Sequence, residues 1–262
     1  MKEHRILDKN VVLGTVLLEL IAFFWVTVVP IFGAGNDTLT SLLVVPGAVI
    51  ALLVFDRIFK GEFLGFVRGG DSNTGLRLVS VMILYFVFLI CQMLFCGEFA
   101  APTLKSFANA CAAGFAEEVV FRGYLITFLL RHRNNTRAIP RILVASSVLF
   151  GVSHLLNING GAPLGITIMQ VIGAVGLGAV FGAVYMRSSN LLIVIVAHSL
   201  TDLIAFMDSV QISEDGIMIA DLTLTNYIDI AICIGMFAYA LYLVRPEKRE
   251  EIISLWDKKW RR

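Results

Sequence analysis

The sequence predicts an all-α membrane protein, a bundle of about eight transmembrane helices. Of the 262 residues, 58% are hydrophobic and 16% are charged, and the mean hydropathy is +0.83. A soluble domain carries about 25% charged residues, so this composition excludes an ordinary soluble protein. The apolar runs are long and continuous, which favours membrane helices over the short alternating strands of a membrane barrel.

Each expected helix is an apolar run of roughly 20 residues, the length that crosses the hydrocarbon core. No low-complexity linker divides the runs, so we predict a single membrane domain over residues 1–262. The first run has the basic flank of a signal peptide, but it is too long and contains Glu19, which indicates a retained span. The expected spans are 11–32, 39–59, 77–97, 105–130, 139–157, 163–186, 190–207 and 227–244.

The basic residues predict how the chain lies in the membrane. Nineteen of the 21 lysines and arginines fall before the first span, in alternate connections or after the last span; Lys105 and Arg122 are the exceptions. The positive-inside rule therefore predicts a multi-pass protein of the cell membrane with both termini in the cytoplasm. The net charge of +1 gives no reason to expect nucleic acid as a partner.

Two further segments have patterns that predict packing. The tail 246–262 is amphipathic, with Ile252, Ile253, Trp256 and Trp260 on one helical face between basic residues. Such a helix suits the surface of an anionic cytoplasmic leaflet, although a solvated tail is the alternative. In the sixth span the spacing of Gly178 and Gly182 predicts the close approach of a neighbouring helix.

A charged group of three residues interrupts the fourth span. Each charge at the bilayer centre costs about 2.5–3.5 kcal/mol, so Glu117, Glu118 and Arg122 are expected to satisfy one another or to perform a function. Glu118 and Arg122 are four residues apart and share a helix face, whereas Glu117 points about 100° away. We therefore predict that Arg122 holds Glu118 and leaves Glu117 free.

Three more polar residues lie in later spans. His154 lies within the fifth span, and His198 and Asp202 are four apart on one face of the seventh. If the three helices are neighbours, these groups must converge, because lipid offers them no partner. A glutamate and a histidine can activate a water molecule, and His198 can donate to an oxyanion. Alternatively, Glu117, His154 and His198 form an open zinc site; both interpretations mean hydrolysis, and the residues do not choose between them.

These residues form three motifs that resemble a known family. Glu-Glu-x-x-x-Arg at 117–122, Phe-x-x-x-His at 150–154 and His-x-x-x-Asp at 198–202 are similar, in order and spacing, to the signatures of the CAAX protease and bacteriocin-processing enzyme (CPBP) family, also called Abi. The stretch with this resemblance covers about 105–206. The resemblance implies that the protein is an intramembrane endopeptidase of eight helices, with its catalytic groups in a water-filled cavity that opens toward the cytoplasm.

The resemblance implies a role for each residue of the site. It implies that Glu117 and His154 activate water, that Glu118 and Arg122 position the helix, and that His198 and the residue at 202 stabilise the oxyanion or hold a metal. Many members of the family have asparagine where this chain has Asp202. An ionised aspartate cannot donate to an oxyanion, so Asp202 must be protonated, orient His198 or bind metal.

We therefore expect an intramembrane endopeptidase that cleaves a membrane-associated protein or peptide, with zinc as the candidate cofactor and a metal-free glutamate mechanism as the alternative. The signatures of other membrane proteases, such as His-Glu-x-x-His, are missing from the sequence. A proton- or ion-coupled transporter, or a non-catalytic immunity or scaffold protein of the same fold, is the alternative function. The substrate and the oligomeric state are not legible from the sequence.

Overall fold

The computed structural model describes residues 70–96, 99–133, 135–207 and 224–260, together with positions 13 and 43. Every regular element within these ranges is a helix, and no β-strand occurs in them. The all-α prediction is therefore confirmed. The expected spans 11–32 and 39–59 lie outside the described residues, apart from those two single positions.

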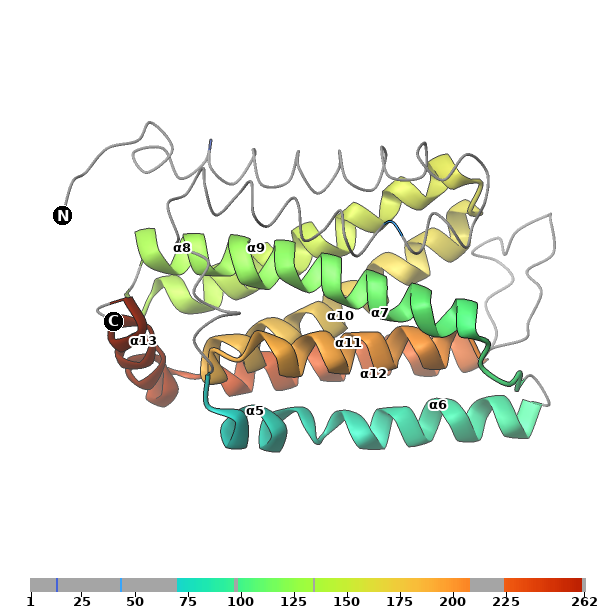
Figure 1. Cartoon of the computed structure of the whole chain (residues 1–262), viewed down its shortest axis with the longest axis horizontal. Coiled ribbons are helices and arrows are strands. Elements are labelled where there is room, and N and C mark those ends of the chain that lie inside the picture. Colours follow the sequence, from blue (N-terminus) through green and yellow to red (C-terminus); the bar gives the residue numbers. More distant parts are fainter. Residues whose placement is uncertain are drawn as a thin grey trace.

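The described helices run side by side along one long axis, except for the last, which crosses the end of the bundle (Figure 1). Most follow the expected spans within a few residues. The helices, including a π-helical segment η1 and a 3₁₀ segment η2, are α5 Ser72–Val79, α6 Met82–Cys96, α7 Leu104–Glu118, η1 Val119–Ile126, α8 Thr127–His132, α9 Ala138–Ser153, η2 His154–Gly160, α10 Leu164–Ser188, α11 Leu191–Ala205, α12 Leu224–Leu243 and α13 Pro246–Trp260.

Three described helices are long and apolar enough to cross a membrane, namely Ser72–Phe95, Ala138–Ile158 and Leu164–Ser188. Counting α12 and α13 as one bent span, with a 68° angle between them, makes up to four. The apolar helix α11 is shorter. The membrane bundle is thus confirmed, whereas the number of eight spans stays a prediction.

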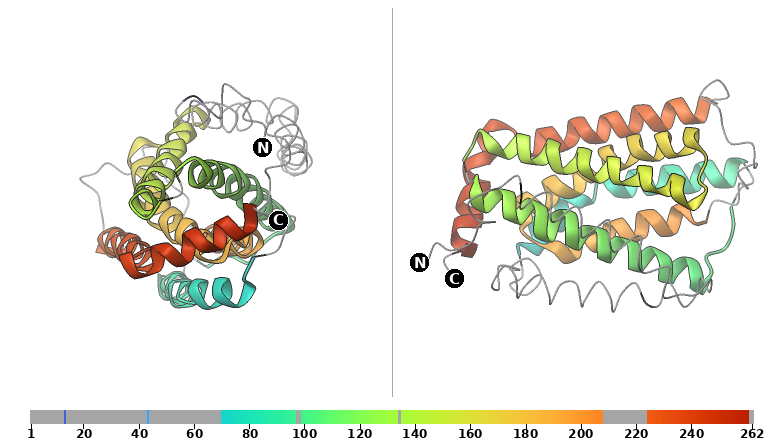
Figure 2. Two further views of the ribbon diagram at one scale, coloured as in Figure 1. Left: turned by 90° about the vertical axis from the view of Figure 1, so that its left-hand side faces the viewer. Right: turned by 90° about the horizontal axis from the view of Figure 1, so that it is seen from above.

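Close backbone approach holds the bundle together around α10. This helix packs against α9 and α12, while α11 packs against α7, and the end-on view in Figure 2 shows the helices grouped around one another. A Cβ atom on Gly178 would lie 2.7 Å from Cδ1 of Phe150, and one on Gly182 would lie 2.9 Å from Cδ1 of Leu143. The predicted close approach at these two glycines is confirmed, with α9 as the neighbour.

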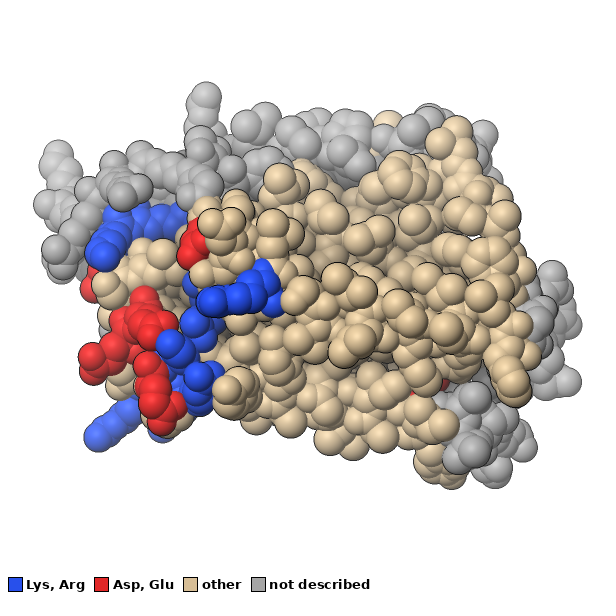
Figure 3. All heavy atoms as spheres, turned by 90° about the horizontal axis from the view of Figure 1, so that it is seen from below, with Lys and Arg blue, Asp and Glu red and all other residues tan. Residues whose placement is uncertain are grey.

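Charged side chains gather at one end of the molecule. On the face shown in Figure 3 they cluster at the end that carries α13, and most of the remaining described surface is uncharged. Hydrogen bonds between helix ends explain the grouping: the amide of Asp71 donates to the Ser188 carbonyl at 2.8 Å, and the Arg187 guanidinium donates to the Leu243 carbonyl at 3.0 Å. The start of α5 and the ends of α10 and α12 therefore meet there. The cytoplasmic position of this end stays a prediction.

The last helix, α13, is amphipathic as expected, but its apolar face packs on the protein. Ile252 and Trp256 are fully buried, and the indole Nε1 of Trp256 donates to the Met186 carbonyl at 2.9 Å. The Lys259 ammonium donates to the Ser189 carbonyl at 2.8 Å. These donors satisfy carbonyls at the end of α10 that have no partner within that helix. Any contact with an anionic leaflet therefore falls to the outer face of α13, and that contact stays a prediction.

The buried Lys259 predicts a pH dependence of stability. Burial lowers its pKa from 10.5 to about 8. Between these values the unfolded chain binds more protons at this site, so this contribution to stability rises as the pH is raised through that window. We expect the melting temperature in detergent, measured from pH 7 to pH 10, to rise more steeply with pH for the parent protein than for Lys259→Gln. Parallel curves would contradict this.

Candidate active site

Arg122 and Glu118 form a buried ion pair, as the sequence predicts. The Nη1 of Arg122 donates to Oε1 of Glu118 at 2.7 Å, and the two side chains are 1% and 0% exposed. The Nη2 atom donates to the carbonyl of Gly178 at 3.0 Å, and the guanidinium lies 4.3 Å from the centre of the Phe150 ring. The arginine therefore joins η1 to α9 and α10 as well as neutralising Glu118.

The helix that carries this ion pair is not a continuous α-helix. The sequence predicts one helix over 105–130, whereas residues Val119–Ile126 form the π-helical segment η1. The hydroxyl of Thr127 donates to the carbonyl of Arg122, five residues earlier, at 3.3 Å, which supports the wider turn. Short π-helical segments are frequent at functional sites. Glu117 and Glu118 are the last two residues of α7, immediately before the change.

His198 lies among three carboxylates. Its Nδ1 is 2.8 Å from Oε1 of Glu118, and because a carboxylate held by Arg122 accepts, Nδ1 is the donor. Its Nε2 lies 3.5 Å from Oδ2 of Asp202 and 3.8 Å from Oε2 of Glu117. The ring stacks on Phe181 with 5.3 Å between centres.

A close contact between α7 and α11 makes this grouping possible. A Cβ atom on Gly114, one turn before Glu118, would lie 2.7 Å from the backbone nitrogen of Ser199. Ser199 follows His198, so the missing side chain lets the imidazole reach the glutamates. The predicted convergence of groups from separate helices is therefore present for Glu117, Glu118, Arg122, His198 and Asp202.

The two adjacent glutamates differ sharply in environment. The Glu118 side chain is 0% exposed and accepts two hydrogen bonds, from Arg122 and His198. The Glu117 side chain is 32% exposed. In both glutamates Oε2 is buried without a hydrogen-bond partner among the described residues, so the difference lies in exposure and in the two bonds to Glu118. Glu117 is thus the more accessible of the two carboxylates.

His154 is oriented by its own helix. Its Nδ1 lies 2.9 Å from the Phe150 carbonyl, and since a carbonyl only accepts, Nδ1 carries the proton in the neutral ring. The lone pair of Nε2 is then available as a base or a ligand. His154 lines a cavity of about 330 Å³ together with His198 and Asp202.

The described residues contain no group of three or more His, Cys, Asp or Glu side chains close enough to hold a metal ion. The predicted zinc ligands Glu117, His154 and His198 are therefore not preassembled as a three-ligand site. Zinc as a cofactor stays a prediction, and we derive no step through it.

Sequence reasoning missed three polar side chains in the cavity wall. They are Gln92 of α6, Gln170 of α10 and Asp229 of α12. Asp229 had a visible signal, because it is the only charged residue between 224 and 244. The two glutamines had none, since uncharged polar residues are common in membrane helices and only the packing shows which of them meet.

The cavity lies in the half of the bundle remote from α13. Most of its lining residues come from the second halves of α6 and α11, from the first half of α10 and from the first half of α12, and α13 follows the opposite end of α12. The resemblance implied a cavity that opens toward the cytoplasm, at the end where the basic residues gather. The directions of these helices instead place the described cavity away from that end.

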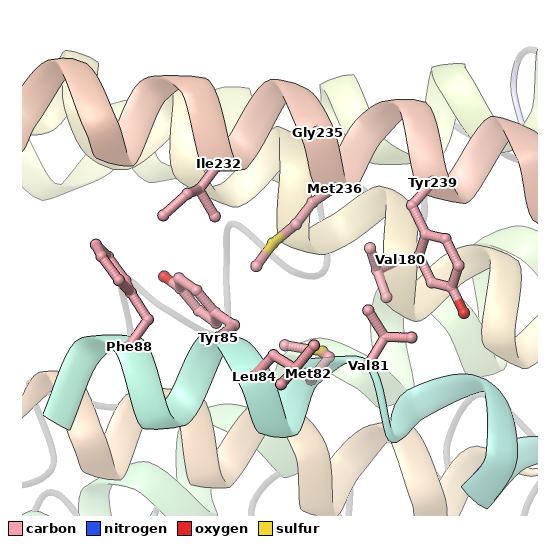
Figure 4. Close-up of a pocket in the computed structure, with 10 residues that line it drawn as sticks. All are labelled: Val81, Met82, Leu84, Tyr85, Phe88, Val180, Ile232, Gly235, Met236 and Tyr239. Carbon is pink, nitrogen blue, oxygen red and sulfur yellow. The ribbon is translucent and has the colours of Figure 1, made fainter. Parts of the chain in front are cut away.

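An apolar groove lies beside the cavity, between α6 and α12. It has a volume of about 350 Å³, and Tyr85 lines both spaces. Figure 4 shows its other side chains, which are mainly aliphatic, with Met236 and Ile232 facing α6 across the gap. A groove of this kind on a membrane helix pair suits a hydrocarbon chain.

Fold and site together define a helical membrane protein with a buried cluster of carboxylates and histidines. Residues 99–204, which contain all three motifs, match the family model described as Rce1-like, type II CAAX prenyl endopeptidase Rce1-like. The recognition of the CAAX protease family from the motifs is thereby confirmed over this stretch, and the family supports an intramembrane protease of the CAAX type in general. No curated protein and no solved structure matches the chain.

Proposed function

We propose that this protein is an intramembrane endopeptidase that hydrolyses a peptide bond of a membrane-associated protein or peptide with water activated by Glu117. The observation that carries the proposal is the difference between the two glutamates. Glu118 is buried and bonded to Arg122 and His198, while the Glu117 side chain is 32% exposed, with its Oε2 3.8 Å from Nε2 of His198. A general base needs such a free carboxylate.

The neighbouring groups take supporting roles in this mechanism. Glu117 removes a proton from the attacking water and gives it to the leaving amine, while the lone pair of His154 Nε2 accepts a hydrogen bond that orients that water. His198, as the imidazolium that its three neighbouring carboxylates favour, keeps Nδ1–H on Glu118 and stabilises the oxyanion through Nε2–H. Asp202, 3.5 Å from that nitrogen, orients the ring, which is the role its distance favours. Glu118 and Arg122 fix the position of His198 and of the helix carrying Glu117.

The substrate we propose carries a hydrocarbon chain. The description of the matching family names prenyl endopeptidases. The apolar groove between α6 and α12 shares Tyr85 with the cavity, so a lipid chain in the groove would lie next to the peptide at the site. We also propose that the α13 end, with its basic residues, faces the cytoplasm.

The proposal is tested by comparing membrane peptides from cells that express the wild-type protein or Glu117→Ala. We expect cleavage products only with the wild-type protein, at equal expression of both. Repeating the experiment with purified protein and a chelator separates the two mechanisms, because a zinc enzyme loses activity and a glutamate mechanism keeps it. The same products from both proteins would refute a role for Glu117.

A further inference from the structure

Asp229 is a charged side chain that the proposed mechanism does not use. It lies in α12, and its Oδ1 is buried without a hydrogen-bond partner in the described part of the chain. An acidic residue in a membrane helix is costly, and such residues mark substrate or ion sites. The carboxylate therefore needs a partner that comes from outside the described chain.

Packing between α10 and α12 places Asp229 in the cavity wall. A Cβ atom on Gly176 would lie 2.6 Å from the carbonyl oxygen of Cys233, so the two backbones nearly touch. Asp229 precedes Cys233 by four residues and so lies one turn away on the same face of α12. It lines the cavity together with Gly173 of α10, and with His154 and the other histidine of the site.

The cavity wall around Asp229 holds further acceptor oxygens, together with donors such as the Tyr85 hydroxyl. Oε1 of Gln92, on α6, is buried and has no hydrogen-bond partner among the described residues. Oε1 of Gln170 already accepts from Asn157 at 2.8 Å. No lysine or arginine is among the described residues that line the cavity, although two aspartates are. An occupant with hydrogen-bond donors and positive charge therefore suits the unbonded oxygens of Asp229 and Gln92.

We propose that Asp229 and Gln92 form a binding subsite for a positively charged side chain, an ammonium or guanidinium group, of the peptide substrate. This rests on the proposed function, and it narrows the substrate class to membrane-associated peptides with lysine or arginine near the cleaved bond. Both oxygens accept hydrogen bonds, and an ionised carboxylate bonds a cation more strongly than a neutral donor. Asp229 is thus a specificity residue and not a catalytic one.

Binding to an inert protein tests the subsite without relying on cleavage. The full chain with Glu117→Gln is reconstituted in lipid nanodiscs and titrated with fluorescent leucine-alanine transmembrane peptides. Each peptide carries one lysine at a chosen position or norleucine in its place. At one or a few positions the lysine peptide should bind about 10- to 100-fold more tightly, the effect of one charge-assisted hydrogen bond. Adding Asp229→Asn should abolish the difference and leave norleucine binding unchanged.

Two comparisons complete the experiment. Glu250→Gln removes an exposed carboxylate of α13 and should keep the preference for lysine, while Asp229→Lys should shift the preference to a glutamate peptide. Equal binding of lysine and norleucine at every position, or a preference that survives Asp229→Asn, would overturn the subsite. So would equal peptide binding together with stabilisation by sodium that needs Asp229, which indicates an inorganic cation. Peptide preference without cleavage by the wild-type protein counts against the proposed function instead.

Discussion

Arg122→Ala is expected to yield little folded protein. The substitution leaves the Glu118 carboxylate buried with only His198 as a partner, and it removes the link from η1 to the Gly178 carbonyl and the Phe150 ring. Breaking one side of a buried ion pair costs about 3–5 kcal/mol, a large share of the roughly 5–15 kcal/mol that keeps a protein folded. The measurements are the yield of monodisperse protein in detergent and its melting temperature.

A second substitution separates this cause from lost packing. Arg122→Ala combined with Glu118→Gln removes the stranded charge, so the double variant should be more stable than Arg122→Ala alone. Arg245→Ala, which removes a partly exposed arginine at the α13 end, is the matched control and should behave like the parent. A stable Arg122→Ala protein, or a double variant no better than the single one, would contradict the argument.

Much of the fold could be predicted because the bilayer limits the choices. Apolar runs of spanning length fix where the described helices lie, and the basic residues predict that the connections at Arg137 and Arg187 share one end. The packing of α13 could not be predicted in the same way. An amphipathic helix buries its apolar face either in lipid or in protein, and Trp256 gives the same pattern in both cases. The carbonyls at the end of α10, which accept hydrogen bonds from Trp256 and Lys259, hold α13 on the protein.

The contacts within one helix of the site could be predicted from the sequence, whereas the contacts between helices could not. Spacing within one helix predicts the Glu118–Arg122 pair, because residues four apart share a face in any helical segment of this length. The contact of His198 with Glu118 depends on how α7 meets α11 at Gly114, which the sequence leaves open. Polar groups that have no partner in lipid do converge, but Asp229 of α12, which lines the same cavity, was not among the residues predicted to do so.

Glu118 lies at the centre of the cluster and holds its neighbours in place. Its Oε1 accepts from both Arg122 and His198, so the carboxylate that is least accessible orders the groups around the one that is accessible. A buried ion pair is a weak source of net stability, but it restricts the geometry of its members. The placement of Glu117 and His198 therefore depends on a residue that never meets the substrate.

The paired glutamates give the second large prediction. Glu117→Gln should lower kcat by about 10²–10⁴-fold, the contribution of a general base, with little change in melting temperature. Its side chain is 32% exposed and its Oε2 makes no hydrogen bond to the described residues, so the amide loses no hydrogen bond at that oxygen. Glu118→Gln should instead lower the melting temperature, because Arg122 is left as a buried cation facing a neutral amide.

The comparison is controlled within the chain, because the two variants make the same chemical change at adjacent residues. Each purified protein is examined for its melting temperature in detergent and for its rate of cleavage of the substrates whose products are identified in membranes. We expect Glu117→Gln to be stable and inactive, and Glu118→Gln to be unstable, with whatever folded fraction remains measured separately. Purified Glu117→Gln that cuts at the wild-type rate would end the proposed mechanism. A Glu118→Gln protein as stable as the parent would show that His198 and Arg122 hold the cluster without the charge.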